Sequence, residues 1–505
     1  MEQFIEHHAS KIHGVLSCLD RIVLNGTIPR ICYAEGMSMV LRQQNIRIFD
    51  YVQWAMPLRQ EIRQNAERLA QAHGLKIDSI RKKNFRKEHR IKKILEKRGD
   101  HPGLVHIFSA MEPCASYKPW HDKKTHRTFL KPDSGKCLHY YFYFIDASLG
   151  LCYLRVPTWA PFRLQFYFNG HNQLAAKLDR RGIGYTLQDN AFLTIDNCKQ
   201  AQKQADNLNI KQLHRLLDQA ARQYCPVIRH FPDSYHWSIM QAEYATDIIF
   251  RRQEDLQPIY EELVRTAVHA VKADNIATFL GRKLHGLYQD EMGNDFSTRI
   301  QQTRLKHHMG PVAVKMYDKY GLVLRIETTV NDVSFFKHYR QVEHRDGTTS
   351  FKQAPLRKSI YSLAILRDLL IASNRRYLAF VSAIDDPGST PRDLEKLARP
   401  ILENGRSYRG FNLFHGDDLD LFGAVLRGEF NISGLTNRAI RVFLPDKTPQ
   451  QISRMLKRLR KHGLIKKVAH TFKYYLTKWG RRIITASLKV REMTLIPLLR
   501  GQLNT

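Results

Sequence analysis

Four polar residues in the segment 312–329 have the types and spacing that phosphoryl-transfer chemistry requires. The segment alternates polar and apolar residues on both sides of turn-forming residues at 318–321, which predicts a β-hairpin. Alternation places four side chains on one face of it: Lys315, Tyr317, Arg325 and Glu327. Cations can neutralise a phosphate, a glutamate can hold a divalent metal, and a tyrosine hydroxyl can attack a phosphodiester once deprotonated. These four are candidate catalytic residues; the structural alternative is that Lys315 or Arg325 simply pairs with Glu327 across the strands.

A second predicted hairpin could complete a metal site. The aromatic run 137–146 predicts a strand, and residues 147–150 turn the chain into a second strand over 151–156. His139 lies in the first strand and Asp146 at the point where that strand enters its turn. Histidine and aspartate suit Mg²⁺ or Mn²⁺ when a further carboxylate such as Glu327 joins them. His139, Asp146 and Glu327 are therefore candidate ligands of Mg²⁺ or Mn²⁺, with a hydrogen-bonded structural histidine as the alternative.

Several other polar positions could line a cleft. His236, Glu243 and Asp247 have helical spacing, with Glu243 and Asp247 at i, i+4, and a solvated helix face explains these three at least as well. The others are Asp20-Arg21, Gly26-Thr27, Glu112-Pro113-Cys114, Gln165, Asn169-Gly170, Asp189-Asn190, Trp237 and Gln241. The sequence contains no P-loop, dinucleotide-binding, zinc-protease or Gly-x-Ser-x-Gly motif, so nucleotide-driven, redox and common hydrolase activities have no support.

The hairpin at 312–329 resembles a pattern of the rolling-circle replication initiators. In that family Tyr-Asp-Lys is followed by Arg-x-Glu, and here Tyr317-Asp318-Lys319 is followed by Arg325-Ile326-Glu327. The resemblance implies metal-assisted cleavage of a DNA strand. The His-hydrophobic-His metal motif of many such nickases does not occur in this sequence, and the family's attacking tyrosine lies elsewhere on a helix. The resemblance therefore does not identify the nucleophile.

Charge indicates the class of partner. The 505 residues include 80 Lys and Arg against 48 Asp and Glu, a formal net charge of +32, which points to a polyanion and most often to nucleic acid. The segment 81–98 contains ten basic residues and two acids. We expect it to contact phosphates, with Arg86 and Arg90 as candidate contacts, unless it forms only a solvated helix face.

The sequence also indicates a compartment. The N-terminus lacks a basic start followed by an apolar core, no run approaches the roughly 18 apolar residues of a membrane span, and the seven cysteines include no C-x-x-C pair. These features predict a cytoplasmic, bacterial-type soluble protein with reduced thiols and no membrane association.

Residues 448–490 carry the strongest local signals. Thr448, Pro449 and Gln451 predict a capped helix start, and Gly463 predicts its end. Two short strands follow over 464–468 and 472–476, and Thr477 can cap a final helix. With an earlier helix near 437–444, the order is that of a winged helix-turn-helix.

The charge of this segment supports binding to DNA. Between residues 435 and 490 there are fifteen Lys or Arg and one acid. A basic helix can lie in the major groove while a wing reaches a phosphate or the minor groove. The candidate nucleic-acid contacts here are Arg454, Lys457, Arg458, Lys461, Lys473 and Arg481. A winged helix used for protein contacts is the alternative.

Two resemblances concern this segment and the whole chain. The run Arg454-Met455-Leu456-Lys457-Arg458-Leu459, with Gly463-Leu464-Ile465 and Tyr475-Leu476-Thr477, resembles the MarR-like winged-helix family, which implies a module that reads duplex DNA. The chain also resembles a widespread group of bacterial proteins of about its own length of 505 residues, labelled by their winged helix alone. The positions that carry this second resemblance are Asp20-Arg21, Gly26-Thr27, Glu112-Pro113-Cys114, Cys137-Leu138-His139, Thr158-Trp159, Pro161-Phe162, Asn169-Gly170 and 315–327.

Together these patterns predict an α+β fold, with a large helical core and antiparallel β-hairpins followed by a C-terminal winged helix-turn-helix. Helical periodicity is expected over 200–305 and a buried-faced helix over 357–383, with a linker at 385–391. The expected domains are a basic, mainly helical region at 1–125, an α+β core with both hairpins at 126–345, a helix and linker at 346–390, and the winged helix-turn-helix at 391–505.

The function that these features favour is nucleic-acid binding of a mobile-element type. The winged helix would bind double-stranded DNA, and the basic core would process a strand, with single-stranded DNA as a further partner, by metal-dependent nicking or strand transfer. One alternative is a non-enzymatic transcription regulator. Another is an RNA-binding protein that partners a structured RNA, in which aromatic strands would stack on bases.

Overall fold

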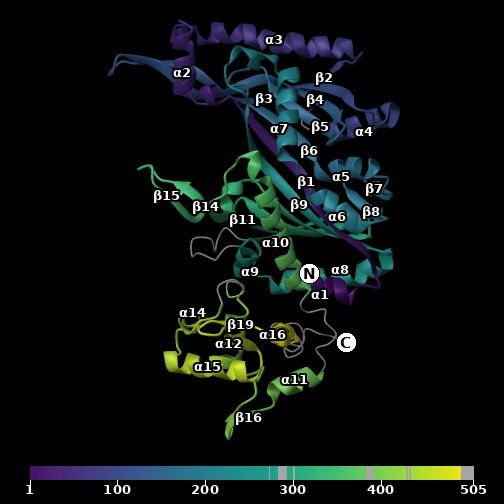
Figure 1. Cartoon of the computed structure of the whole chain (residues 1–505), viewed down its shortest axis with the longest axis vertical. Helices are drawn as coiled ribbons and strands as arrows, with labels where there is room; N and C mark the ends of the chain where they lie inside the picture. The colour runs from purple at the N-terminus through teal and green to yellow at the C-terminus, as the bar shows by residue number, and fades with distance from the viewer. Residues whose placement is uncertain are drawn as a thin grey trace. The chain divides into compact units, whose positions relative to one another are not determined.

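The protein is an α+β chain that divides into two compact units (Figure 1). The computed structural model describes residues 1–82, 84–271, 273–281, 293–299, 302–382, 391–427, 430 and 434–490. Unit 1 comprises Met1–Val15, Thr246–Thr328 and Leu370–Thr505, and unit 2 comprises Leu16–Ala245 and Thr329–Leu369. Each unit therefore combines segments that are distant in the sequence.

Unit 2 is built on a sheet with the strand order β9-β1-β6-β5-β4-β3-β2. Neighbours from β1 to β3 are antiparallel, whereas β2 runs parallel to β3. The strands are β1 (Ile12–Thr27), β2 (Ile77–Ile80), β3 (Gly103–Asp122), β4 (Arg127–Asp146), β5 (Gly150–Pro157), β6 (Leu164–Asn169) and β9 (His236–Phe250). As chain segments, β1 and β9 continue into unit 1.

The aromatic run of β4 reflects burial on both faces of the sheet. Phe142 and Phe144 lie with their ring centroids 4.7 and 5.3 Å from that of Tyr224 on α7 (Ile210–Tyr224). Tyr141 and Tyr143, on the opposite face, share a core cluster with Ile91 of α4 (Lys87–Arg98). Because successive residues of a strand point to opposite faces, a strand covered on both sides needs apolar residues throughout.

The other elements of unit 2 are helices and two separate hairpins. The helices are α2 (Ala34–Gln43), α3 (Tyr51–Ala72), α5 (Gly170–Asp179), α6 (Cys198–Asp206), and the 3₁₀-helices η1 (Pro29–Ile31), η2 (Ile48–Asp50), η3 (Pro226–His230), η5 (Val333–Phe335) and η6 (Ile360–Ser362). The hairpins are β7 (Tyr185–Gln188) with β8 (Ala191–Ile195), and β14 (Lys337–Glu343) with β15 (Thr349–Pro355).

Unit 1 contains strands in the order β10-β11-β12-β13-β9. The strands are β10 (Gly293–Arg299), β11 (Gln302–Met309), β12 (Val312–Lys319) and β13 (Val323–Val330), and the helices beside them are α1 (Glu2–His7), α8 (Gln253–Ala270), α9 (Ala273–Phe279) and α10 (Leu363–Val381). Asn374 of α10 accepts a hydrogen bond from Thr328 at 2.6 Å and donates one to Thr246 at 3.1 Å. These bonds satisfy polar groups where α10 covers the sheet.

Residues 391–490, here called the C-terminal module, have a hydrophobic core of their own. Its elements are α11 (Pro391–Ala398), β16 (Ile401–Glu403), β17 (Arg406–Tyr408), α12 (Gly416–Val425), α14 (Asn437–Arg441), α15 (Pro449–Lys461), β18 (Ile465–Lys467), β19 (Tyr474–Leu476) and α16 (Lys478–Val490). The core includes Leu421, Phe422, Ile440, Ile452, Leu456, Leu459, Ile465 and Ile483.

The local predictions for this module are confirmed. Thr448 and Gln451 form a capping box at the start of α15, with Pro449 as its first residue. Gly463 follows the helix at φ 69°, a left-handed conformation that suits glycine. Thr477 accepts a hydrogen bond from the amide of Gly480 at 2.8 Å at the start of α16. The order of elements is the expected one, while the assignment as a winged helix stays a prediction.

Both predicted hairpins are present, as β4–β5 and β12–β13, but two expectations of helix need correction. Residues 1–125 contain β1, β2 and β3 beside their helices, and residues 200–305 contain β9, β10 and part of β11 beside theirs. β1 is buried along most of its length and β9 along its second half, so these stretches lack the alternation by which a strand is detected. The expected linker at 385–391 lies, apart from Pro391, outside the described residues.

Two further features concern the cysteines and membrane-spanning helices. All seven cysteines are free thiols, and none of the described helices combines the length and the apolar character that crossing a bilayer requires.

Candidate functional site

The β12–β13 hairpin brings three of the four predicted catalytic residues together. Nζ of Lys315 lies 2.6 Å from Oε1 of Glu327, and the hydroxyl of Tyr317 donates a hydrogen bond of 2.6 Å to Oε2. Tyr320 and Gly321, at φ 59° and 72°, form the tight turn between the strands. The Glu327 side chain is 2% exposed and that of Lys315 is 14% exposed. Glu327 is thus the centre of a largely buried polar cluster.

This cluster meets one requirement of a tyrosine nucleophile. A hydroxyl becomes nucleophilic when an adjacent base accepts its proton, and the Glu327 carboxylate lies at hydrogen-bonding distance from Tyr317. Lys315 also forms the cross-strand ion pair of the structural alternative. The same three residues therefore stabilise the hairpin by pairing across its strands and also have the arrangement that acid–base chemistry requires.

Arg325 forms a buried ion pair with Asp247 on β9. Its Nε and Nη2 atoms each lie 2.6 Å from a carboxylate oxygen of Asp247 on β9. The two side chains are 0% and 1% exposed. A bidentate pair of this kind neutralises the guanidinium and orients it inward. Arg325 therefore has a structural partner within the fold.

The three predicted metal ligands do not form one site. His139 and Asp146 lie seven residues apart on β4, about 23 Å at 3.3 Å per residue, and point to opposite faces. Oδ1 of Asp146 accepts the amides of Ser148 and Leu149 at 2.7 and 3.0 Å, which fixes the turn. Nδ1 of His139 lies 3.1 Å from the carbonyl oxygen of Cys137. Burial, followed by the nearby Arg155 cation, lowers the pKa of His139 to about 4. Both residues have structural partners.

Asp20 of unit 2 is the centre of a polar cluster that sequence patterns do not assemble. It is 3% exposed. Its Oδ1 accepts hydrogen bonds from the side chains of Asn169 and Asn190 at 2.7 and 2.8 Å and lies 3.1 Å from Nδ1 of His171. Asp20, Asn169 and Asn190 are separate polar positions in the sequence, and no periodicity links them because three elements bring them together.

Glu243 extends this group of acids. One of its carboxylate oxygens lies within 4.8 Å of an oxygen of Asp20. Two carboxylates at this spacing are compatible with one hard cation such as Mg²⁺ or Mn²⁺. Glu243 also accepts a hydrogen bond from Thr329 at 3.2 Å. Of the residues in unit 2, Asp20 and Glu243 therefore fit a metal better than His139 and Asp146.

Another acid of unit 2, Glu112, belongs to a network of hydrogen bonds and an ion pair. The Tyr141 hydroxyl donates to it at 2.7 Å, and Arg155 lies 2.7 Å from it. Burial alone would raise the pKa of Glu112, but the hydrogen bonds and charge of these partners outweigh it and hold the pKa below its usual value. Lys87 lies 3.6 Å from the Tyr141 ring centroid. Glu112 is thus held ionised by partners within the fold.

In the C-terminal module, α15 presents a cationic face to solvent. Ile452, Leu456 and Leu459 are buried, whereas Arg454, Lys457 and Arg460 are exposed. On the β18–β19 hairpin Lys466, Lys467 and Lys473 are exposed, and Phe472 at its tip is 86% exposed. The predicted contacts Arg454, Lys457 and Lys473 are therefore accessible to a polyanion.

The side chains of Arg458 and Lys461 pair with acids of the module itself. They are therefore less available for nucleic acid than predicted. The two terminal nitrogens of Arg458 lie 2.7 and 2.9 Å from the oxygens of Asp418, and its guanidinium lies 3.8 Å from the Phe411 ring centroid. The side chains of Arg458 and Asp418 are 11% and 1% exposed. Lys461 pairs with Glu403. Their charges are balanced inside the module.

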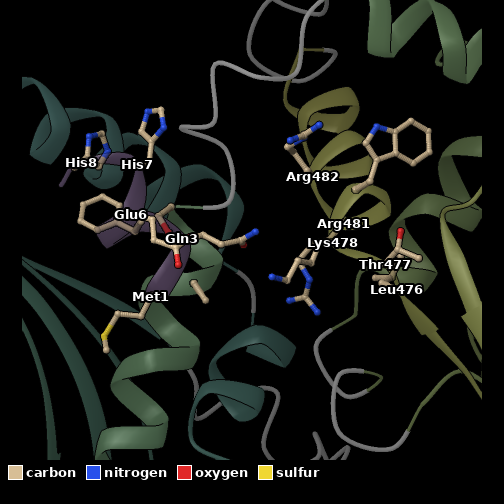
Figure 2. Close-up of a pocket in the computed structure, with 14 residues that line it drawn as sticks. Met1, Gln3, Glu6, His7, His8, Leu476, Thr477, Lys478, Arg481 and Arg482 are labelled. Carbon is tan, nitrogen blue, oxygen red and sulfur yellow. The ribbon is translucent and has the colours of Figure 1, made fainter. Parts of the chain in front are cut away.

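Arg481 lines a pocket of unit 1. Figure 2 shows Lys478, Arg481 and Arg482 of α16 on one side of this pocket and Gln3 and Glu6 of α1 on the other. Burial lowers the pKa of Arg481. Arg481 is thus less accessible than Arg454 or Lys473.

The basic segment 81–98 is partly surface and partly structural. Arg86 is exposed just before α4, and Nε of Arg90 lies 3.5 Å from Asp78. Arg98 donates to the carbonyls of Gly99 and His101 at 3.2 and 2.8 Å beyond the end of the helix. Arg86 remains an accessible cation, whereas Arg90 has an acidic neighbour.

Comparisons of this chain with models of protein families, with curated proteins and with solved structures find no match.

Proposed function

We propose that this protein binds nucleic acid, with the C-terminal module acting as a winged helix on double-stranded DNA in a mobile-element type of process. The support is the order α14, α15, β18–β19, α16, in which α15 would serve as the recognition helix and β18–β19 as the wing. An antiparallel bridge between Leu435 and Tyr474 places a third short segment beside β19.

The observation that carries this proposal is the distribution of charge on α15. Its apolar residues face the module's core, and Arg454, Lys457 and Arg460 face solvent. In the part of the module that the structure describes, the acids Asp418 and Glu403 pair with Arg458 and Lys461, and no ion pair involves the exposed row. A row of free cations on a helix, with three lysines on the adjacent hairpin, releases counterions when it meets phosphates. We expect α15 to enter the major groove and Lys473 to contact the backbone.

The Tyr317–Glu327 contact favours a second activity, cleavage of a DNA strand. In this proposal Glu327 accepts the phenolic proton as the Tyr317 oxygen attacks phosphorus, and the departing strand leaves with a free hydroxyl after protonation by solvent. Lys315 would offset the negative charge. A metal such as Mg²⁺ or Mn²⁺ would supply Lewis-acid stabilisation of the phosphate when bound.

One purification tests these proposals against their rivals. The full chain is purified with and without nuclease, the bound nucleic acid is identified, and the protein is incubated with supercoiled and single-stranded DNA in Mg²⁺ or Mn²⁺. We expect DNA binding, together with nicking that Glu327→Gln abolishes and a covalent adduct that Tyr317→Phe abolishes. Duplex binding without nicking or adduct would leave a non-enzymatic regulator. Bound RNA that survives moderate salt, with no affinity for duplex DNA, would overturn the proposal in favour of an RNA partner.

A further inference from the structure

The β14–β15 hairpin of unit 2 carries an exposed aromatic pair in a basic setting. Tyr339 and Phe351 are 67% and 72% exposed, and their rings stack with centroids 6.0 Å apart and planes 22° from parallel. The hairpin forms a two-stranded sheet of its own (Figure 1). Exposing two large rings side by side costs hydration free energy unless a partner covers them.

The register shows what surrounds the pair. Tyr339 lies opposite Gln353 and Phe351 lies opposite Gln341, so the rings occupy one diagonal of a four-residue patch and two amides the other. All four residues are exposed. An aromatic surface flanked by amides offers stacking faces together with hydrogen-bond donors and acceptors. Flat heteroaromatic groups with polar edges match this combination.

The charge of the hairpin identifies the rest of the ligand. Residues 337–358 contain six Lys or Arg and two acids, a net charge of +4. On the other face Arg340 and Lys352 lie directly opposite each other, a like-charge pair that destabilises an isolated sheet. Arg340 donates to the backbone carbonyls of Pro355 and Gln341 and so keeps its charge. Lys337 precedes Tyr339 by two residues, so it shares the face of the rings, and it is exposed. A cation beside stacking rings suits a flat group that is attached to phosphate.

We propose that this hairpin binds unpaired nucleobases of a single nucleic-acid strand, with Tyr339 and Phe351 stacking on bases and Lys337, on the same face, contacting a phosphate. Bases within a duplex are already stacked on one another, whereas those of a single strand can stack on protein rings. The hairpin lies outside the C-terminal module, so the inference does not depend on duplex binding by α15.

The test uses the full chain and four fluorescein-labelled probes: (dT)20, (U)20, an abasic strand of the same length, and a mixed-sequence duplex. We expect (dT)20 to bind more tightly than the abasic strand. Tyr339→Val/Phe351→Val should weaken (dT)20 binding about five- to a hundredfold and should leave abasic and duplex binding unchanged. Valine keeps the strand preference of the hairpin while removing both rings. A (U)20 probe distinguishes RNA from DNA.

Controls keep the outcome clear. Phe49→Val removes an aromatic residue of unit 2 that is 62% exposed and lies outside the hairpin, and it should not change (dT)20 binding. The rate of tryptic cleavage at Arg345 in the hairpin turn should be the same in the double variant and the wild type, which shows that the β14–β15 hairpin of the variant is folded. Equal losses on (dT)20 and the abasic strand, or no loss on either, overturn the inference. Duplex binding without any (dT)20 binding overturns it while leaving the proposed function intact; no binding to any probe overturns both.

Discussion

At the scale of single residues, Arg458 is a cation that stabilises the module through its ion pair with Asp418, in contrast to the exposed cations proposed to bind DNA. Removing Arg458 leaves the Asp418 carboxylate, 1% exposed, with the largely exposed Arg409 as its remaining cation partner in the described module. Breaking a buried pair on one side costs about 3 kcal/mol or more. We expect Arg458→Ala to reduce the unfolding free energy of the module by this amount, as measured by hydrogen exchange of the α15 amides. Arg460→Ala, at an exposed position, should change it by less than about 0.5 kcal/mol.

His139 gives a prediction about pH. Its pKa is lowered to about 4 in the fold, against 6.5 in the unfolded chain, chiefly by burial. The unfolded state therefore binds the proton first, and the stability that the neutral imidazole confers is complete above pH 6.5 and is lost between pH 6.5 and about 4. This contribution is about 3 kcal/mol.

Urea denaturation across this pH range measures the effect. His139→Asn keeps a donor for the Cys137 carbonyl and should flatten the fall in stability on acidification. Part of the fall should remain, because burial also lowers the pKa of His307 to about 4. An identical pH dependence in the variant and the wild type would contradict the assigned environment of His139.

At the scale of elements, α15 depends on its N-terminal capping box. Thr448 accepts the amide of Gln451 at 3.3 Å, and the Gln451 side chain accepts the amide of Thr448 at 2.7 Å. We expect Thr448→Ala to cost about 1 kcal/mol in thermal unfolding of the module. Thr448→Ser retains the hydroxyl and should lose little, and a loss as large as that of alanine would argue against the cap.

The elements also show what sequence patterns can and cannot predict. The capping box at Thr448, the glycine stop at Gly463 and both turn-centred hairpins are local, because residues within a few positions of each other determine them. β1 and the second half of β9 escape detection because burial on both faces removes their alternation.

Pairings between distant elements escape detection for a different reason. Nothing in the spacing of Arg325 and Asp247 indicates that a bidentate bond joins them 78 residues apart, and the same holds for Asp20 with Asn169 and Asn190. Of the candidate site, therefore, the shared hairpin face of Lys315, Tyr317 and Glu327 is predictable, and the partners that neutralise Arg325, Arg458 and Lys461 are not.

At the scale of the whole molecule, the chain has a net charge of +32. Some of its basic residues pair with acids inside the fold, and others are exposed. Arg325, Arg458 and Lys461 are neutralised by acids, so they add nothing to long-range attraction. Arg454, Lys457 and Lys473 remain exposed on the C-terminal module, and Lys337 and Lys352 remain exposed on the β14–β15 hairpin. Two separate basic surfaces are expected to engage different parts of a nucleic acid, one duplex and one unpaired.

The most direct test of duplex binding is the salt dependence of affinity for a mixed-sequence 30-base-pair DNA. We expect Arg454→Ala/Lys457→Ala to weaken binding and to reduce the slope of log affinity against log salt by about two, one for each lost phosphate contact. Lys447→Ala removes a cation that already pairs with Asp417 at 2.8 Å and should leave the slope unchanged. If the double variant binds with the wild-type affinity and slope, α15 does not contact DNA and the account of the C-terminal module is wrong.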